Sequence, residues 1–81
     1  MERVSIEYYS VKMLYDENSL NKFQNFNNFW EACGTYHNWC DSHTFIVVMT
    51  KTIIGNSTTN ECTITVYDPE KDKEDREKVF F

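Results

Sequence analysis

The sequence is poor in the residues that build phosphate loops, disulfide frameworks and membrane spans. Its 81 residues include two glycines, one proline and three cysteines. The two glycines, Gly34 and Gly55, are too few for a glycine-rich phosphate loop or a dinucleotide-binding fingerprint. An odd number of cysteines without a secretory signal argues against a disulfide framework and for reduced thiols. We therefore expect a protein that is not an enzyme and that carries no cofactor.

Long hydrophobic runs are also missing. The longest, residues 45–49, is far shorter than the roughly 20 apolar residues that span a bilayer. Residues 1–4 contain no apolar stretch of the kind found in a signal peptide. The length corresponds to one domain, so we expect residues 1–81 to form a single cytoplasmic domain with a small stability margin.

Basic residues are outnumbered by acidic ones. Thirteen acidic and eight basic side chains give a formal net charge of -5. A negative surface repels phosphate backbones and anionic headgroups, so we expect no direct nucleic-acid or membrane partner. The remaining class of macromolecular partner is another protein.

The first half of the sequence predicts one strand and one helix. Residues 4–15 are rich in β-branched and aromatic side chains at alternating positions, which is typical of a strand. The apolar side chains occupy even positions up to Tyr8 and odd positions from Tyr9. Either a bulge there reverses the two faces of the strand, or both faces are covered. From residue 20 the apolar spacing changes to three and four, the pattern of an amphipathic helix. The stripe of this helix consists of Leu20, Phe23, Phe26, Trp30 and Cys33.

The flanking residues fit the two ends of that predicted helix. A side-chain oxygen of Asn18 or Ser19 can cap its start, and Gly34 suits its end. We expect the stripe to pack on the later strands through Ile46, Val48, Ile64 and Val66. Replacing Phe23 or Phe26 by alanine would then cost about 3 to 5 kcal/mol of stability.

The second half of the sequence predicts a hairpin. Residues 45–54 begin with a continuous apolar run, as expected for a central strand covered on both faces. The turn at residues 55–58 leads into residues 61–67, where apolar side chains alternate with threonines. Residues 68–70 are typical of a helix start, and residues 79–81 offer a short edge strand.

These elements predict an α+β fold with two layers. One helix packs on a small, mainly antiparallel sheet, in the order β-α-β-β with an optional short C-terminal strand. The sequence leaves open whether the first strand runs parallel or antiparallel to its neighbours.

A compact group of potential metal ligands begins with the last residue of the predicted helix stripe and continues after it. The group consists of Cys33, His37, Cys40 and His43. Its spacing lacks the Cys-x2-4-Cys knuckle of common zinc sites. On one continuous helix, Cys33 and Cys40 would lie about 10 Å apart along the axis, so one ion could not bind both. An irregular connection after Gly34 would allow the ligands to converge. We expect no obligate metal site, and keep a small zinc-binding module as an alternative.

Aromatic residues are abundant, with six phenylalanines, five tyrosines and two tryptophans. One helix covers only one face of a sheet, so something else must cover Tyr9 and Tyr15 on the first strand. Tyrosine and tryptophan often anchor protein interfaces. Tyr36 and Trp39, with the acidic Asp41 beside them, are therefore predicted as three partner-binding residues. Tyr9 and Tyr15 are predicted as two more. A second interpretation of Trp39 is that it closes the end of the core.

A small acidic chain with many asparagines, interface-type aromatics and no catalytic motif resembles the general type of phage- or mobile-element-encoded inhibitors and immunity proteins. The resemblance implies a stoichiometric, anti-defence or immunity role. The partner would be a nucleic-acid-processing enzyme, or a defence or toxin protein, that the acidic surface attracts. A homodimeric structural or assembly module is the main alternative.

Overall fold

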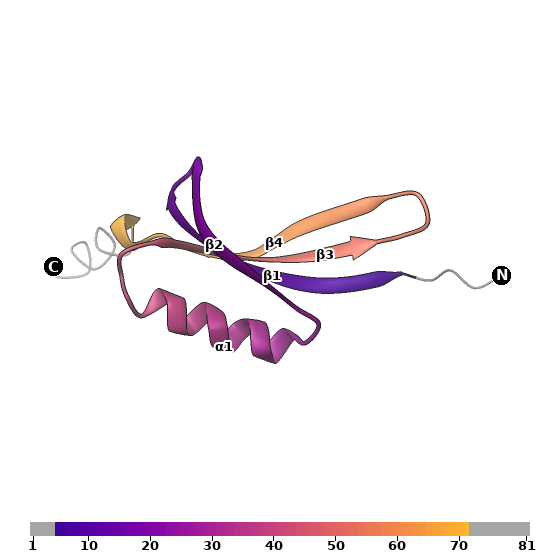
Figure 1. The fold of residues 1–81 in the computed structure, drawn as a ribbon, viewed down its shortest axis with the longest axis horizontal. Coiled ribbons are helices and arrows are strands. Elements are labelled where there is room, and N and C mark those ends of the chain that lie inside the picture. The colour runs from indigo at the N-terminus through magenta and orange to yellow at the C-terminus, as the bar shows by residue number, and fades with distance from the viewer. Residues whose placement is uncertain (1–4, 72–81) are drawn as a thin grey trace, which may run out of the picture.

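The computed structural model describes residues 5–71, which form a small α+β structure (Figure 1). The elements are β1 (Ile6–Asp16), β2 (Ser19–Phe26), α1 (Phe29–Cys40), β3 (Ile46–Ile54) and β4 (Thr59–Tyr67). The strands form one antiparallel sheet in the order β2-β1-β3-β4. α1 lies across one face of this sheet, against β1, β2 and β3. The hairpin of β3 and β4 and the start of β1 extend beyond the helix (Figure 1).

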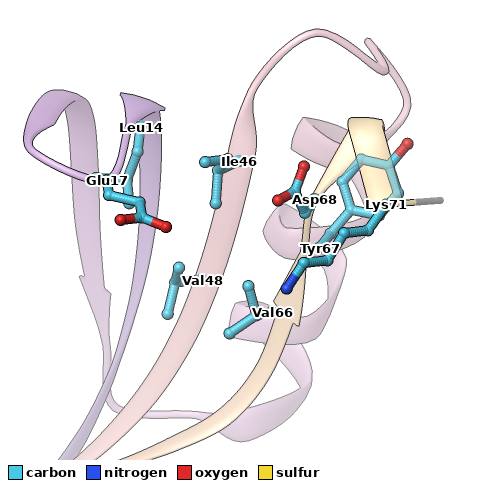
Figure 2. Close-up of a pocket in the computed structure, with 8 residues that line it drawn as sticks. All are labelled: Leu14, Glu17, Ile46, Val48, Val66, Tyr67, Asp68 and Lys71. Atoms are coloured by element: carbon cyan, nitrogen blue, oxygen red, sulfur yellow. The ribbon is translucent and has the colours of Figure 1, made fainter. Parts of the chain in front are cut away.

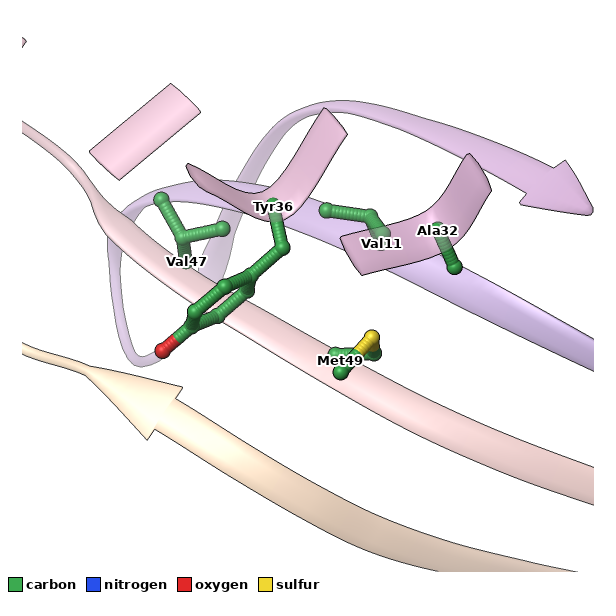
Figure 3. Close-up of a cluster of buried hydrophobic side chains, with 5 residues drawn as sticks. All are labelled: Val11, Ala32, Tyr36, Val47 and Met49. Carbon is green, nitrogen blue, oxygen red and sulfur yellow. The ribbon is translucent and has the colours of Figure 1, made fainter. Parts of the chain in front are cut away.

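The core lies between α1 and the two inner strands, β1 and β3 (Figure 3). Its buried residues are Val11, Ala32, Tyr36, Val47 and Met49. Val11 is the direct cross-strand partner of Met49, which places both side chains on the same face of the sheet. Ala32 and Tyr36 are four residues apart on α1 and so share the helix face that meets them. A ring of half-buried side chains surrounds this cluster.

The observed element order, β-β-α-β-β, corrects the predicted β-α-β-β order. Residues 20–26 belong to β2 instead of a helix, and β2 pairs with β1 as a hairpin. Asn18 lies in the turn between them, where its N–H donates to the Asp16 carboxylate over 2.8 Å. The spacing of Leu20, Phe23 and Phe26 imitates a helix because β2 is an edge strand with polar residues on both faces. Its apolar residues therefore do not alternate.

The helix begins and ends later than the sequence pattern predicts. Asn28 caps its start, since its side-chain oxygen accepts hydrogen bonds from the backbone N–H groups of Trp30 (2.8 Å) and Glu31 (3.4 Å). Gly34 lies within the helix, which continues to Cys40. The predicted end at Gly34 is therefore wrong, and residues 35–40 are helical and not an irregular connection.

The predicted core is also wrong. Phe23 is 56% exposed and Trp30 is 77% exposed, and Leu20, Ile64 and Val66 are exposed as well. On β3 the helix packs over Val47 and Met49, which have the opposite parity to the predicted Ile46 and Val48. Strand β3 is apolar at both parities, so its sequence alone does not indicate which face meets the helix. Of the predicted stripe, Phe26 and Cys33 do pack against the core.

Other expectations are confirmed. β3 is an inner strand, and its hairpin with β4 closes through the predicted turn, where the Gly55 N–H donates to the Thr58 carbonyl over 2.8 Å. β1 is antiparallel to both neighbours, which settles the direction that the sequence left open. The pairing of β1 with β3 is continuous across Tyr8 and Tyr9, so no bulge switches the faces there. The predicted strand at residues 79–81 lies outside the described residues.

The two faces of the sheet predict losses of stability of different size for two large-to-small substitutions. Met49→Ala should lower the free energy of unfolding by about 2 to 5 kcal/mol, because it opens a cavity in the core. Phe23→Ala, on the exposed position, should change it by less than about 1 kcal/mol. Urea denaturation of both variants measures the two values. A larger loss for Phe23→Ala than for Met49→Ala would show that the core lies on the other face.

The substitution Gly34→Ala tests where the helix ends. No atom lies within 4 Å of a Cβ built at this exposed position, so Gly34→Ala should raise stability by about 0.5 to 1 kcal/mol through better helix propensity. If the helix ended here with a left-handed glycine, alanine would instead be strained and would lower stability. The sign of the change in the urea midpoint therefore separates the two descriptions.

Candidate interaction surface

The Cys/His cluster is spread along the helix and the connection after it. Cys33, His37 and Cys40 all belong to α1, whereas His43 lies in the connection to β3 with a positive φ of 54°. The His43 Nδ1 is 2.7 Å from the hydroxyl of Tyr67, a contact that joins this connection to the end of β4. Within residues 5–71, no three His, Cys, Asp or Glu side chains are grouped so that they could hold a metal ion.

Cys40 and Tyr36 lie side by side at the edge of the core. Burial raises the pKa of the Cys40 thiol, and the charge of Asp41 adds to this rise, while a hydrogen bond with Tyr36 opposes it. Burial also raises the pKa of the Tyr36 phenol, against the lowering effect of its contact with Thr65, whose hydroxyl oxygen is 3.3 Å away. A thiol with a raised pKa is mainly protonated near pH 7 and is therefore a poor nucleophile.

The predicted partner-binding residues on the helix side differ in accessibility. Tyr36 is only 9% exposed and belongs to the core, so its ring does not form part of the surface. Trp39 is half-buried against the core, with the ammonium of Lys22 4.8 Å from its ring centre. This placement agrees with the second interpretation, in which Trp39 closes the end of the core. Asp41 is exposed at the end of α1, where its N–H donates to the His37 carbonyl.

The two predicted strand tyrosines also lie apart from each other. Tyr9 is half-buried and packs edge-on against Phe29, with ring centres 5.5 Å apart. Tyr15 is 61% exposed and makes a similar edge contact with Phe45. The structure therefore does not gather the predicted residues into one exposed patch. A role in binding remains a prediction for Tyr9, Tyr15, Trp39 and Asp41.

An apolar surface lies on the sheet face opposite α1, the face that one helix leaves uncovered, but the sequence patterns predicted most of its side chains as part of the core. Within residues 5–71, α1 packs on the other face (Figure 1), although Ser10, Thr50 and Thr52, which share the parity of Lys12 and Val48 on this face, are buried. Cross-strand pairing aligns Phe23 with Lys12, Lys12 with Val48, and Val48 with Val66, so these side chains form one row across all four strands. A second row contains Leu20, Leu14 and Ile46. We call this surface the open face. The continuous apolar run of residues 46–49 was the signal for it, because such a run indicates a strand that is covered on both faces.

A groove lies at the end of the open face, with a volume of about 560 Å³ (Figure 2). Its apolar lining comes from β1, β3 and β4, and consists of Leu14, Ile46, Val48 and Val66. Figure 2 shows the carboxylates of Glu17 and Asp68 on opposite sides of Ile46. Lys71 and Tyr67 complete the lining. The groove therefore combines apolar walls with charged groups at its rim.

Comparisons with known proteins give no match: no family model, no curated protein and no solved structure is similar to this chain. None of the helices described between residues 5 and 71 has the length and apolar character needed to cross a membrane.

The raised pKa of Cys40 predicts its reactivity. At pH 8 the native Cys40 thiol should react with iodoacetamide several-fold more slowly than the exposed Cys62, because burial raises the pKa of Cys40 and covers part of its thiol. Mass spectrometry of digested protein measures the two rates. The same protein in urea is the control, where the two rates should converge. Equal rates in the native protein would contradict the placement of Cys40.

Proposed function

We propose that the protein is a non-catalytic, acidic module that binds another protein through its open face. The observation that supports this most directly is the row of Phe23, Lys12, Val48 and Val66, in which Phe23 is 56% and Val66 55% exposed. Contiguous apolar patches on small proteins commonly mark interaction sites.

The open face offers enough binding energy for a specific complex. Four strands about 4.8 Å apart make each row roughly 14 Å wide. Burying one valine or phenylalanine side chain that is otherwise exposed contributes about 1.5 to 3 kcal/mol. A few well-packed, fully buried side chains in the centre of an interface, most often aromatic residues or arginine, account for most of the affinity of typical complexes.

Charge indicates the class of partner. A net charge of -5 favours association with a basic protein surface and increases the rate of encounter at low salt. Basic surfaces are typical of enzymes that process nucleic acid, since these must bind phosphate backbones. The proposed role is therefore that of a stoichiometric cytoplasmic inhibitor of such an enzyme, or of a defence or toxin protein, of the kind that phages and mobile elements encode.

A homodimeric assembly module is the second candidate, and one observation favours it. The centre of the open face carries an internal ion pair, in which the Lys12 ammonium is 3.6 Å from the Glu61 carboxylate. The row across the strands is therefore nearly neutral, so two copies could meet there without strong repulsion.

Site-specific cross-linking distinguishes these functions. A photoreactive p-benzoylphenylalanine in place of Phe23 should form a covalent adduct with one host protein after irradiation, because Phe23 lies on the open face. The same group in place of Asn38, exposed on α1, is the matched control and should form none. An adduct only at position 38 would place the interface on the helix side. An adduct of the chain with itself would support the homodimer instead, and no adduct at position 23 would contradict binding through the open face.

A further inference from the structure

We propose that the groove at the end of the open face takes an arginine or lysine side chain of the partner protein, flanked in the partner by apolar residues. This inference rests on the proposed function and specifies the chemistry of its partner. Leu14, Ile46, Val48 and Val66 provide apolar walls along which the methylene stem of a long basic side chain can pack. The charged head of that side chain would then reach the rim of the groove.

The rim carries an excess of negative charge. Glu17 and Asp68 line the groove, and both also line an adjoining hollow of about 250 Å³. That hollow adds the carboxylates of Asp16 and Glu70. Counted over residues 5–71, the two adjoining hollows therefore present four carboxylates and one ammonium group, that of Lys71. A cationic group is the complement of such a surface.

The described basic side chains form no ion pair with these carboxylates. Between residues 5 and 71, the ion pairs are Lys12 with Glu61 and Lys51 with Glu7, both away from the groove. Local hydrogen bonds hold two of the four carboxylates in place: the Asn18 N–H donates to Asp16, and the Glu70 N–H donates to Asp68 over 3.0 Å. The charge is therefore positioned and available for a partner.

The combination of walls and charge selects a basic side chain over other occupants. A purely apolar side chain would leave the carboxylates of Glu17 and Asp68 partly desolvated without a partner, which costs free energy. An arginine guanidinium can donate two parallel hydrogen bonds to one carboxylate, while its stem remains on the apolar walls.

A peptide probe tests this inference on the full chain. The probe is a fluorescein-labelled nonapeptide of alternating leucine and arginine, and fluorescence anisotropy in 150 mM salt measures its dissociation constant. The combined variant Glu17→Lys and Asp68→Asn should weaken binding at least tenfold, because it reverses one negative charge at the groove and removes another. The asparagine keeps an oxygen that can accept the Glu70 N–H.

Two controls identify non-specific attraction. Glu31→Lys reverses one charge on α1 and should change the dissociation constant less than threefold, since Glu31 is exposed in the first turn of the helix. A peptide with glutamate in place of arginine should not bind. An effect of Glu31→Lys as large as that of the groove variant, or unchanged binding by the groove variant, would overturn the proposal. So would a concentration-dependent dimer of the protein alone that is lost in the groove variant, because a second copy would then be the occupant.

The failure of this inference can be told apart from the failure of the proposed function. If cross-linking from position 23 persists at full yield in the combined Glu17→Lys and Asp68→Asn variant, the open face binds a partner but the groove does not recognise a basic side chain. If cross-linking from position 23 is absent while the wild-type protein binds the peptide, the groove chemistry holds and the proposed function fails.

Discussion

The packing of one short helix on a longer sheet determines the rest of this structure. At about 1.5 Å per residue, the twelve residues of α1 extend about 18 Å, whereas the nine residues of β3 extend about 30 Å. α1 therefore covers part of one face of the sheet, and the core reduces to a cluster of five buried residues between α1, β1 and β3. The opposite face has no cover of this kind among the described residues. Its two rows, which are apolar apart from Lys12, follow directly from the register of the strands.

This constraint links stability to binding. A domain of this size buries a limited share of its surface, so its stability is a small difference between large terms. A partner that covers the open face would add apolar burial that the chain cannot supply by itself, and would stabilise the folded state by mass action. The two parts of the open face would have different tasks in such a complex. The neutral rows would supply burial, and the acidic groove would supply orientation and choice of partner.

The strands of the sheet could largely be predicted from the sequence, because β1, β3 and the turn after β3 carry strong local signals. β2 could not, since an edge strand that is polar on both faces has no alternation, and its three apolar residues happen to repeat at helical spacing. The predicted helix began too early because the apolar residues of β2 have helical spacing. The observed helix begins after Asn28, whose side chain caps it, and continues past Gly34, where the pattern had ended it. On β3 the core was placed on the wrong parity, because this strand is apolar on both faces, whereas Phe26 does pack against the core as predicted. The groove joins residues from β1, β3, β4 and the chain after it, a combination that only the strand register reveals.

Methyl NMR with a soluble paramagnetic co-solute tests most directly the claim that one face is packed and the other is open. Valines lie on both faces, so one residue type reports on each. In the isolated protein, the methyl signals of Val66 should be strongly broadened and those of Val48 moderately, whereas those of Val11 and Val47 should remain sharp, since both are fully buried. Protection of Val66 equal to that of Val11 and Val47 in the isolated, monomeric protein would contradict the account.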